Sequence, residues 1–237
     1  MINWTFVNAD FAMIKATQGR GETAATKLLS RFTDSRFKRN ITNARCPCGV
    51  YHYFTAQDKD KAIAETDYFC SVIEPYRARI KLWAALDVES YYLDGLDKTE
   101  LTAIVRAALE RIEARGFKPM LYTNPNFLKY RFEPGAFDDV PIWLAHWGVP
   151  KPYSVPNLKI WQYGTAVVNG VSKSVDADYG YFELDGYAVG DLYTIKPGDV
   201  YSNGKAVPER LVGKSYTIAQ IKPDKVLLGE ISSWVRV

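Results

Sequence analysis

The chain has 237 residues, of which 47% are apolar and 24% carry a charge, a globular composition that excludes a disordered tail, a collagen and a charge-driven scaffold. Thirty Lys and Arg residues against 27 Asp and Glu residues leave a net charge of +3, which suits an anionic surface such as a cell wall but lacks the concentrated basic face of a nucleic-acid-binding protein. No run approaches the ~18 unbroken apolar residues of a membrane helix, so we expect a soluble protein without a membrane partner.

Short β-rich runs alternate with helical runs over the first 185 residues. The expected strands lie at residues 11–17, 49–54, 82–89, 119–124, 141–147, 158–163 and 174–179, and the expected helices at 34–45, 58–79 and 98–115. Such alternation predicts an α/β fold with a parallel sheet and crossover helices. The third helix is strongly periodic and is followed by Gly116, where a C-cap glycine is expected. Because a closed barrel of the TIM type needs eight strands and seven are found, we expect an irregular (β/α)-barrel that lacks one strand.

The pattern changes near residue 187, where helical periodicity ends and Gly and Pro recur. Short alternating runs follow at 215–221, 226–228 and 232–237, which is typical of a small all-β module near the lower size limit for independent folding. We therefore expect a barrel domain over residues 1–185 and an all-β domain over residues 191–237, with the boundary between 183 and 191.

The run from Leu82 to Glu89 is the most informative segment for chemistry. Its continuous apolar residues predict a strand that is buried on both faces, and it ends in Asp87, Val88 and Glu89. Since side chains alternate along a strand, Asp87 and Glu89 share one face, at the C-terminal mouth where TIM-type barrels carry out catalysis. Their repulsion and partial burial are expected to keep one of them protonated near neutral pH, as a general acid must be.

A second acidic pair, Asp176 and Asp178, ends the last strand before the domain boundary. The first and last strands of a barrel are neighbours, so this pair is expected to face the first pair across the mouth. Acids that flank one cleft are what cleavage of a glycosidic bond requires: one donates a proton to the leaving oxygen, and another activates water, acts as nucleophile or stabilises positive charge. The alternative interpretation is structural, because Asp and Glu at strand ends also cap helices, form turns or pair with basic residues.

Seven aromatic residues fall in or at the ends of the expected strands: Tyr51, Tyr53, Tyr122, Trp143, Trp147, Trp161 and Tyr163. Flat rings at the mouth of a cleft make stacking platforms for sugars. About half of these rings are expected to pack in the core instead, with Trp143 and Trp161 as the first candidates.

Three cysteines, Cys46, Cys48 and Cys70, are an odd number in a chain long enough to build its own core, so we expect free thiols. One residue separates Cys46 from Cys48, too few for a zinc knuckle, and only His52 and His146 are available to join them. We therefore expect no metal, and no other cofactor, since no phosphate-binding glycine motif follows a strand. Two histidines without a G-x-S-x-G elbow exclude a Ser-His-Asp hydrolase, and His52 is expected to be a hydrogen-bonded strand histidine.

These residues, in this order, resemble glycoside hydrolase family 25, the lysozymes (N-acetylmuramidases) found in phage endolysins and in secreted bacterial and fungal enzymes. The resemblance runs from Asn3 to about Phe182 and rests on eight segments in register, at residues 11–19, 34–40, 49–54, 85–89, 120–124, 143–145, 160–163 and 175–176. It implies that Glu89 matches the general acid of the family and that Asp87 and Asp176 match its supporting carboxylates.

The resemblance also implies a saccharide groove lined by Tyr122 and by aromatics near Tyr53 and Trp147, and we expect Asp178 to bind substrate beside them. It leaves two routes open for the second half-reaction: direct attack by water, or a ring intermediate formed by the substrate's own 2-acetamido group and steadied by an Asp. Family members begin with a strand that carries an Asp, whereas this chain opens at Ile2-Asn3-Trp4, just after that point. The absent strand is therefore expected to be the first one, together with an acidic residue of the site.

The C-terminal segment resembles a bacterial SH3-like wall-binding domain over residues 198–205, 211–218, 226–228 and 231–235. The resemblance implies a module that holds the enzyme on peptidoglycan and raises its local concentration there; the alternative is a folding appendage. No basic leader with an apolar core opens the chain, so no signal peptide is predicted. We expect release from a host cytoplasm, as in phages, and action at the bacterial cell wall or outside the cell.

The leading interpretation is a monomeric peptidoglycan hydrolase of the phage endolysin type that cleaves between N-acetylmuramic acid and N-acetylglucosamine, with Glu89 as the proton donor and without a cofactor. The missing strand motivates a second interpretation, a catalytically silent protein that binds the cell wall. A third is a chitinase-like barrel, because a D-x-E motif at the end of a barrel strand also suits acetamido-assisted hydrolysis of chitin.

Overall fold

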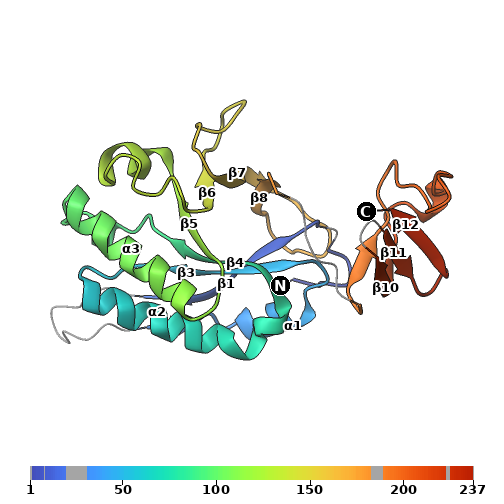
Figure 1. The fold of residues 1–237 in the computed structure, drawn as a ribbon, viewed down its shortest axis with the longest axis horizontal. Coiled ribbons are helices and arrows are strands. Elements are labelled where there is room, and N and C mark those ends of the chain that lie inside the picture. The colour runs from blue at the N-terminus through green and yellow to red at the C-terminus, as the bar shows by residue number, and fades with distance from the viewer. Residues whose placement is uncertain (1, 8, 20–30, 183–188, 223–224, 237) are drawn as a thin grey trace.

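The computed structural model describes residues 2–7, 9–19, 31–182, 189–222 and 225–236, which form two β-sheets at opposite ends of the long axis (Figure 1). The large sheet consists of β1 (Ala12–Gln18), β2 (Phe32–Thr33), β3 (Cys48–Tyr53), β4 (Ile80–Asp87), β5 (Pro119–Thr123), β6 (Ile142–Ala145), β7 (Leu158–Ala166) and β8 (Val175–Gly180). Its α-helices are α1 (Phe37–Asn43), α2 (Lys59–Ile73) and α3 (Lys98–Ala114). The small sheet consists of β9 (Leu192–Thr194), β10 (Ser215–Lys222), β11 (Lys225–Leu228) and β12 (Ser233–Arg236).

The large sheet has the strand order β2-β1-β3-β4-β5-β6-β7-β8. Strands β1 and β3 to β7 run parallel, while β2 and β8 run antiparallel to their neighbours. All seven strands and three helices predicted for this part are present with shifted ends. The short strands β2 and β9 were not predicted, because two or three residues give no readable alternation.

The predicted irregular barrel of the TIM type is confirmed as a curled α/β sheet, and two features depart from a closed parallel barrel. First, β8 runs antiparallel to β7, because the segment between them is a short hairpin connection, whereas a parallel strand needs a crossover of a dozen or more residues. Second, the sheet is open: among the described residues, β8 is paired on one side only, with β7. The observed fold is a mixed α/β sheet curled into a half-barrel.

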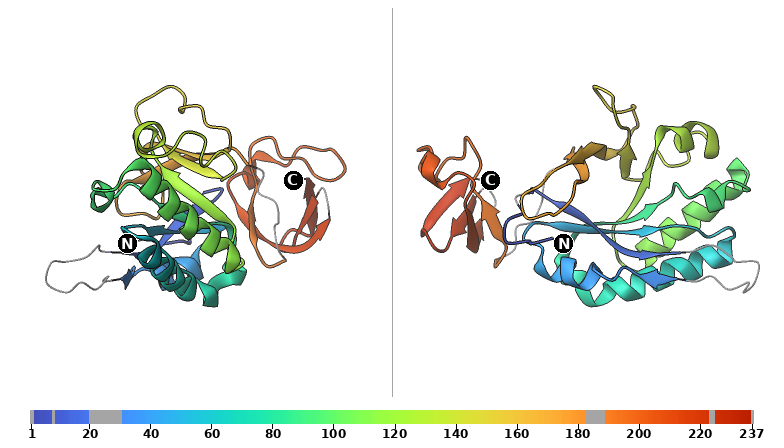
Figure 2. Two further views of the ribbon diagram at one scale, coloured as in Figure 1. Left: turned by 60° about the vertical axis from the view of Figure 1, so that its left-hand side comes forward. Right: turned by 180° about the vertical axis from the view of Figure 1, so that it is seen from behind.

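The helices follow from local sequence signals. Helix α3 begins with a capping box in which Asp97 accepts a hydrogen bond from the backbone of Glu100 and Glu100 returns one. It ends before Gly116, whose φ of +76° confirms the predicted C-cap glycine. The apolar stripe predicted for α3 is buried throughout, over Leu101, Ile104, Val105, Ala108, Leu109 and Ile112. Figure 2 shows α2 and α3 side by side against one face of the large sheet.

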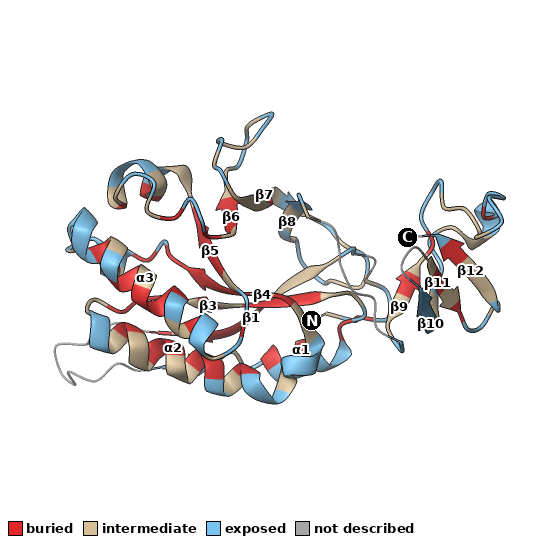
Figure 3. Cartoon of the chain, viewed as in Figure 1, coloured by how far each residue is buried: buried red, intermediate tan, exposed pale blue. Residues whose placement is uncertain are grey.

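Two apolar clusters lie on the two faces of the large sheet. The larger packs between the sheet and the helices and includes Ile14, Val50, Leu86, Leu121 and Leu144. The smaller lies on the opposite face, called the inner face below, and consists of Ala85, Met120, Tyr122, Trp143 and Ile160. Figure 3 shows the resulting band of buried residues along the central strands and on the helices. Alternation along each strand thus decides which side chains meet the helices and which reach the inner face.

The small sheet is antiparallel, with the order β12-β11-β10-β9, and it has an apolar core of its own. That core is formed by Tyr193, Ile195, Val207, Ile218, Val226, Leu228 and Val235. The predicted domain boundary, residues 183–191, falls largely on 183–188, which lie outside the described residues. None of the described helices is long and apolar enough to cross a membrane.

Candidate active site

The register of neighbouring strands and the alternation of side chains along each strand bring polar side chains into one row on the inner face. Asp87 at the end of β4 pairs in register with Tyr53 on β3 and with Tyr122 on β5, and Tyr122 pairs with Trp143 on β6. Since the carboxyl ends of these parallel strands meet at one edge of the sheet, the four side chains lie together at the mouth of the half-barrel.

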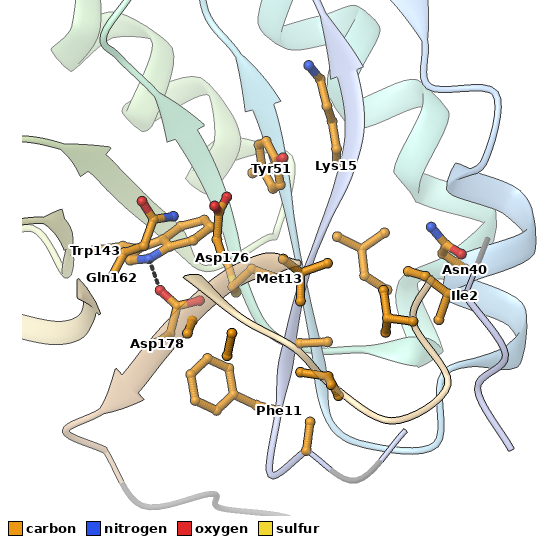
Figure 4. Close-up of a pocket in the computed structure, with 18 of the residues that line it drawn as sticks. Ile2, Phe11, Met13, Lys15, Asn40, Tyr51, Trp143, Gln162, Asp176 and Asp178 are labelled. Carbon is orange, nitrogen blue, oxygen red and sulfur yellow. Dashed lines mark hydrogen bonds between the residues drawn. The ribbon is translucent and has the colours of Figure 1, made fainter. Parts of the chain in front are cut away.

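A cavity of about 970 Å³ opens on this face between β1 and β8. All four carboxyl groups singled out in the sequence, those of Asp87, Glu89, Asp176 and Asp178, line it. Figure 4 shows Met13 of β1 on one side of the cavity and the two aspartates of β8 on the other. The cavity therefore occupies the opening that the unclosed sheet leaves, and the two acidic pairs face it from different strands. Asp176 and Asp178 lie in the first part of β8, not at its end as predicted, because the strand runs antiparallel to β7.

Asp87 is the most deeply placed of these acids, with 7% of its surface exposed. Its Oδ1 atom is buried and has no hydrogen-bond partner among the described residues. Burial, followed by the charges of Glu89 and Asp176, raises the pKa of Asp87 well above its usual range, although Lys15 acts in the opposite direction. The Asp87 carboxyl group thus binds its proton far more tightly than a surface aspartate does.

Glu89 and Asp176 are open to the cavity. Val88 is buried and its backbone N–H donates to Tyr122, which turns Asp87 and Glu89 to the same face. Partial desolvation raises the pKa of Glu89, and the charge of Asp176 adds to this effect. Desolvation also raises the pKa of Asp176. Both groups therefore remain protonated to higher pH than free carboxylic acids.

Asp178 is fixed by a hydrogen bond from the indole Nε1 of Trp143 to its Oδ1, 2.7 Å long. Figure 4 shows this bond at one wall of the cavity. Burial raises the pKa of Asp178 to about 6, while the bond from Trp143 lowers it and the charge of Asp176 raises it. A carboxyl group with such a pKa changes charge within the range in which many enzymes work.

The predicted aromatic residues divide differently from the expectation, because Trp143, expected in the core, also lines the cavity, as do Tyr51 and Tyr163. Tyr53 and Tyr122 line the cavity, and Trp143 and Trp161 are buried. Trp147 is 51% exposed and does not line the cavity itself, but its Nε1 donates to Oε1 of Gln162, which does.

Two residues of the cavity lie within the segments 11–19 and 160–163 of the family resemblance, without a predicted role. Lys15 lines it from β1, in register with Tyr51, and its ammonium group donates to Gln18 over 2.8 Å. Gln162 lines it from β7 and is paired with Asp178. The alternation of the predicted strands places both on the inner face, but it does not tell a site residue from a packing residue.

His52 lies on the other face and takes no part in the cavity. It is fully buried, and its ring nitrogens bond to Thr17 over 2.7 Å and to Glu65 over 2.8 Å, which confirms a hydrogen-bonded strand histidine. The three cysteines are free thiols, as predicted. Over the described ranges, no group of three or more His, Cys, Asp and Glu residues is arranged to hold a metal ion.

Four carboxyl groups and several aromatic rings around one cavity of a curled α/β sheet are typical of enzymes that cleave glycosidic bonds. The sequence profile of the glycosyl hydrolases family 25 matches residues 2–171, and the chain belongs to this family.

Known proteins of this kind match over most of the chain. The autolytic lysozyme of Clostridium acetobutylicum is 31% identical over 189 residues, which are 78% of this chain and 52% of that protein. Lysozyme M1 of Streptomyces globisporus is 31% identical over 195 residues, 74% of this chain and 62% of that protein. The chain thus spans about half to three fifths of the length of these relatives. The crystal structure of the Clostridium perfringens spore cortex lytic enzyme SleM shares the fold, with a TM-score of 0.67 and 22% identity over 99% of this chain and 82% of that one.

Proposed function

We propose that this chain is a peptidoglycan hydrolase, a muramidase that cleaves the bond between N-acetylmuramic acid and N-acetylglucosamine in bacterial cell walls. The observation that carries the proposal is the gathering of Asp87, Glu89, Asp176 and Asp178 around one cavity, each with a raised pKa. Membership of the family supports it, and so do the names of both curated relatives, each of which is a lysozyme.

Glu89 is the proposed general acid. It is open to the cavity, so that a glycosidic oxygen can reach it, and its raised pKa keeps it protonated to higher pH. The proton passes from the Glu89 carboxyl group to the leaving oxygen as the bond to the anomeric carbon breaks, and a positive charge develops on the sugar ring. The charge of Asp176 adds to the raised pKa of Glu89 before this step, and in their ionised forms Asp176 and Asp87 stabilise the positive charge during it.

The proposed substrate-binding residues surround these acids. Tyr53 and Tyr122 offer rings in the cavity wall, and Trp147 offers a half-exposed ring beside it, each suited to stacking against the apolar face of a sugar. Asp178, held by Trp143, accepts hydrogen bonds from sugar hydroxyl groups when it is ionised.

The proposal also covers the C-terminal part. Residues 191–237 form an SH3-like domain that binds the cell wall, and they follow a catalytic domain of residues 1–185, in the arrangement of a phage endolysin. The separate apolar core of the small sheet and the Gly- and Pro-rich sequence of this part support the division. The enzyme acts as a monomer at the cell wall or outside the cell.

Substitution Glu89→Gln tests the function directly, because it removes the acidic proton with almost no change in size. We expect the release of reducing ends from purified walls to fall at least roughly a hundredfold, the usual contribution of a general acid. Glu113→Gln, the same change at an exposed position on α3, serves as the matched control. Unaltered circular dichroism and melting temperature in both variants would show that the fold persists.

Other results of the same assay would contradict the proposal. Wall hydrolysis retained in the Glu89→Gln variant would assign the acid to another residue. Turnover of chitin without turnover of walls by the unaltered chain would favour the chitinase-like alternative. Binding to walls without any release of reducing ends would favour the catalytically silent one.

A further inference from the structure

Gln162 occupies a central position in the cavity wall that the proposed roles leave unexplained. It lies on β7, is 3% exposed, and pairs in register with Asp178. Its Oε1 atom accepts two hydrogen bonds, one from the hydroxyl group of Tyr122 over 3.0 Å and one from Nε1 of Trp147 over 2.9 Å. This single oxygen therefore connects a ring of the cavity wall with the exposed ring beside it.

These two bonds fix the orientation of the amide group. An indole N–H is a donor only, so the atom that Trp147 meets must be the oxygen of Gln162. The amide nitrogen then occupies the other position, and its two hydrogens make no hydrogen bond to any described residue. Figure 4 shows the Gln162 amide beside the Trp143 ring, among the side chains that border the cavity. Gln162 thus offers an oriented pair of donors to whatever fills the cavity.

Three other donors of the inner face are already used within the protein. The indole N–H groups of Trp143 and Trp147 and the hydroxyl group of Tyr122 each donate to a protein acceptor, and the Lys15 ammonium group uses one of its three hydrogens on Gln18. In their ionised forms the four carboxyl groups only accept, and they then favour the donating hydroxyl groups of a sugar. A carbonyl oxygen, which also only accepts, is repelled by ionised carboxylates and needs an N–H or O–H donor.

We propose that Gln162 is a specificity-determining residue that recognises the N-acetyl group of the sugar, by donating from its amide nitrogen to the acetamido carbonyl oxygen. This inference rests on the proposed glycan-cleaving function and names the substrate class more closely: glycans with N-acetylated amino sugars, in preference to their de-N-acetylated forms. Tyr122 and Trp147 act as positioning residues, because they hold the amide in the orientation that presents its N–H groups.

The test compares one glycan in two states. Purified wall glycan is de-N-acetylated, and half of it is N-acetylated again with acetic anhydride, so that the two samples differ only in the acetyl group. We expect the unaltered chain to prefer the acetylated sample in kcat/KM. Gln162→Met removes both donors at nearly constant volume and lowers this preference roughly tenfold, the effect of losing about one hydrogen bond.

Two further variants separate recognition from mere support of the fold. Gln162→Glu, when ionised, keeps an acceptor for Tyr122 and Trp147 but has no donor, so it also loses the preference at the alkaline end of its active pH range. Gln57→Met makes the same chemical change at a partly buried glutamine outside the cavity, whose amide bonds to the backbone of Tyr92. The Gln57→Met variant is expected to keep the preference of the unaltered chain.

The outcomes distinguish this inference from the function on which it rests. Equal losses on both samples in the Gln162→Met variant, or an unchanged preference, overturn the recognition role while the hydrolase stands. If the unaltered chain cleaves neither sample, the proposed function fails, and calorimetric binding decides on Gln162 alone. Tighter binding of an N-acetylglucosamine hexamer than of a glucose hexamer, lost in Gln162→Met, supports the role; equal binding of the two hexamers, or no binding of either, overturns it.

Discussion

At the scale of single residues, the cavity is costly for the folded chain because it concentrates groups of like charge. Asp87 is buried with one carboxyl oxygen unpartnered, and Glu89 and Asp176 both act on it. Each of these groups reduces the cost by binding its proton more tightly than a free carboxylic acid does, which is what the raised pKa values express. A carboxyl group whose pKa is raised in this way still carries a proton closer to neutral pH, where it can serve as a general acid.

The titration of Asp178 predicts how stability depends on pH. Its pKa is raised from near 3.8 to about 6 by folding, so between these values the folded chain binds more protons than the unfolded chain does. The stability that this group contributes is complete below about pH 4 and is lost as the pH rises through about 6. Asp178→Asn, which keeps an oxygen to accept the bond from Trp143, should therefore stabilise the chain by about 1–3 kcal/mol at pH 8 and leave it almost unchanged at pH 4.

Urea unfolding at both pH values measures this difference. Asp97→Asn, a change at the exposed N-cap of α3, is the control for a general effect of replacing Asp by Asn. Equal effects of Asp178→Asn at pH 4 and pH 8 would mean that ionisation of the Asp178 carboxyl group does not lower the stability of the folded chain.

The sequence predicted the acids of the site but not the residues that orient them. Alternation along 82–89 and 174–179 was sufficient to put Asp87 with Glu89 and Asp176 with Asp178, because a period of two is dictated by the strand itself. Gln162 and Lys15 stand in equally regular strands. Their importance depends on hydrogen bonds to residues of other strands, such as Trp147 and Gln18, which no local pattern encodes.

At the scale of elements, a buried polar network ties the start of the sheet to a helix. His52 on β3 bonds to Thr17 on β1 and to Glu65 on α2, and Glu65 also accepts hydrogen bonds from the backbone and hydroxyl group of Thr55. All four residues are fully buried. The network therefore fixes how α2 sits behind the two strands that carry Lys15 and Tyr53 into the cavity.

Removal of the Glu65 carboxyl group should destabilise the whole half-barrel. Glu65→Ala leaves the His52 ring and the Thr55 backbone N–H buried without their acceptor, a loss of about 3–5 kcal/mol. Glu113→Ala, on the exposed side of α3, should change the free energy of unfolding by less than about 0.5 kcal/mol. Denaturant midpoints of the two variants check the difference, and a small effect of Glu65→Ala would show that water replaces the lost acceptor.

The elements themselves were predictable where the signal is local, and not where it depends on topology. Helix α3 has a capping box, an apolar stripe and a C-cap glycine, and each is visible in sequence. The direction of β8 is different, because residues 174–179 alternate in the same way whether the strand runs parallel or antiparallel. Only the short connection from β7 decides it, and the prediction of a parallel sheet with crossover helices gave that length too little weight.

At the scale of the whole molecule, two separately cored sheets are joined in one chain. The described contact between them includes an exposed pair, Lys196 and Asp10, 3.8 Å apart, which contributes little to stability. Residues 189–237 contain seven Lys and Arg residues against five Asp and Glu residues, so this fifth of the chain holds two of its three net positive charges. Such a part is suited to an anionic polymer surface, although its charge is too low to act by electrostatics alone.

The proposed division of labour predicts that a chain ending at residue 182 keeps its chemistry and loses its hold on the wall. Tethering makes each later encounter with the glycan nearly intramolecular. Its loss should raise the wall concentration that gives half-maximal activity on the order of a hundredfold. Cleavage of a short soluble glycan should be unaffected, since such a substrate offers only one site and the Lys196–Asp10 contact is exposed. Kinetics of both chains on whole walls and on soluble glycan provide the comparison. A parallel loss on the soluble glycan would instead make the small sheet a structural support of the cavity, because nothing but the cavity touches that substrate.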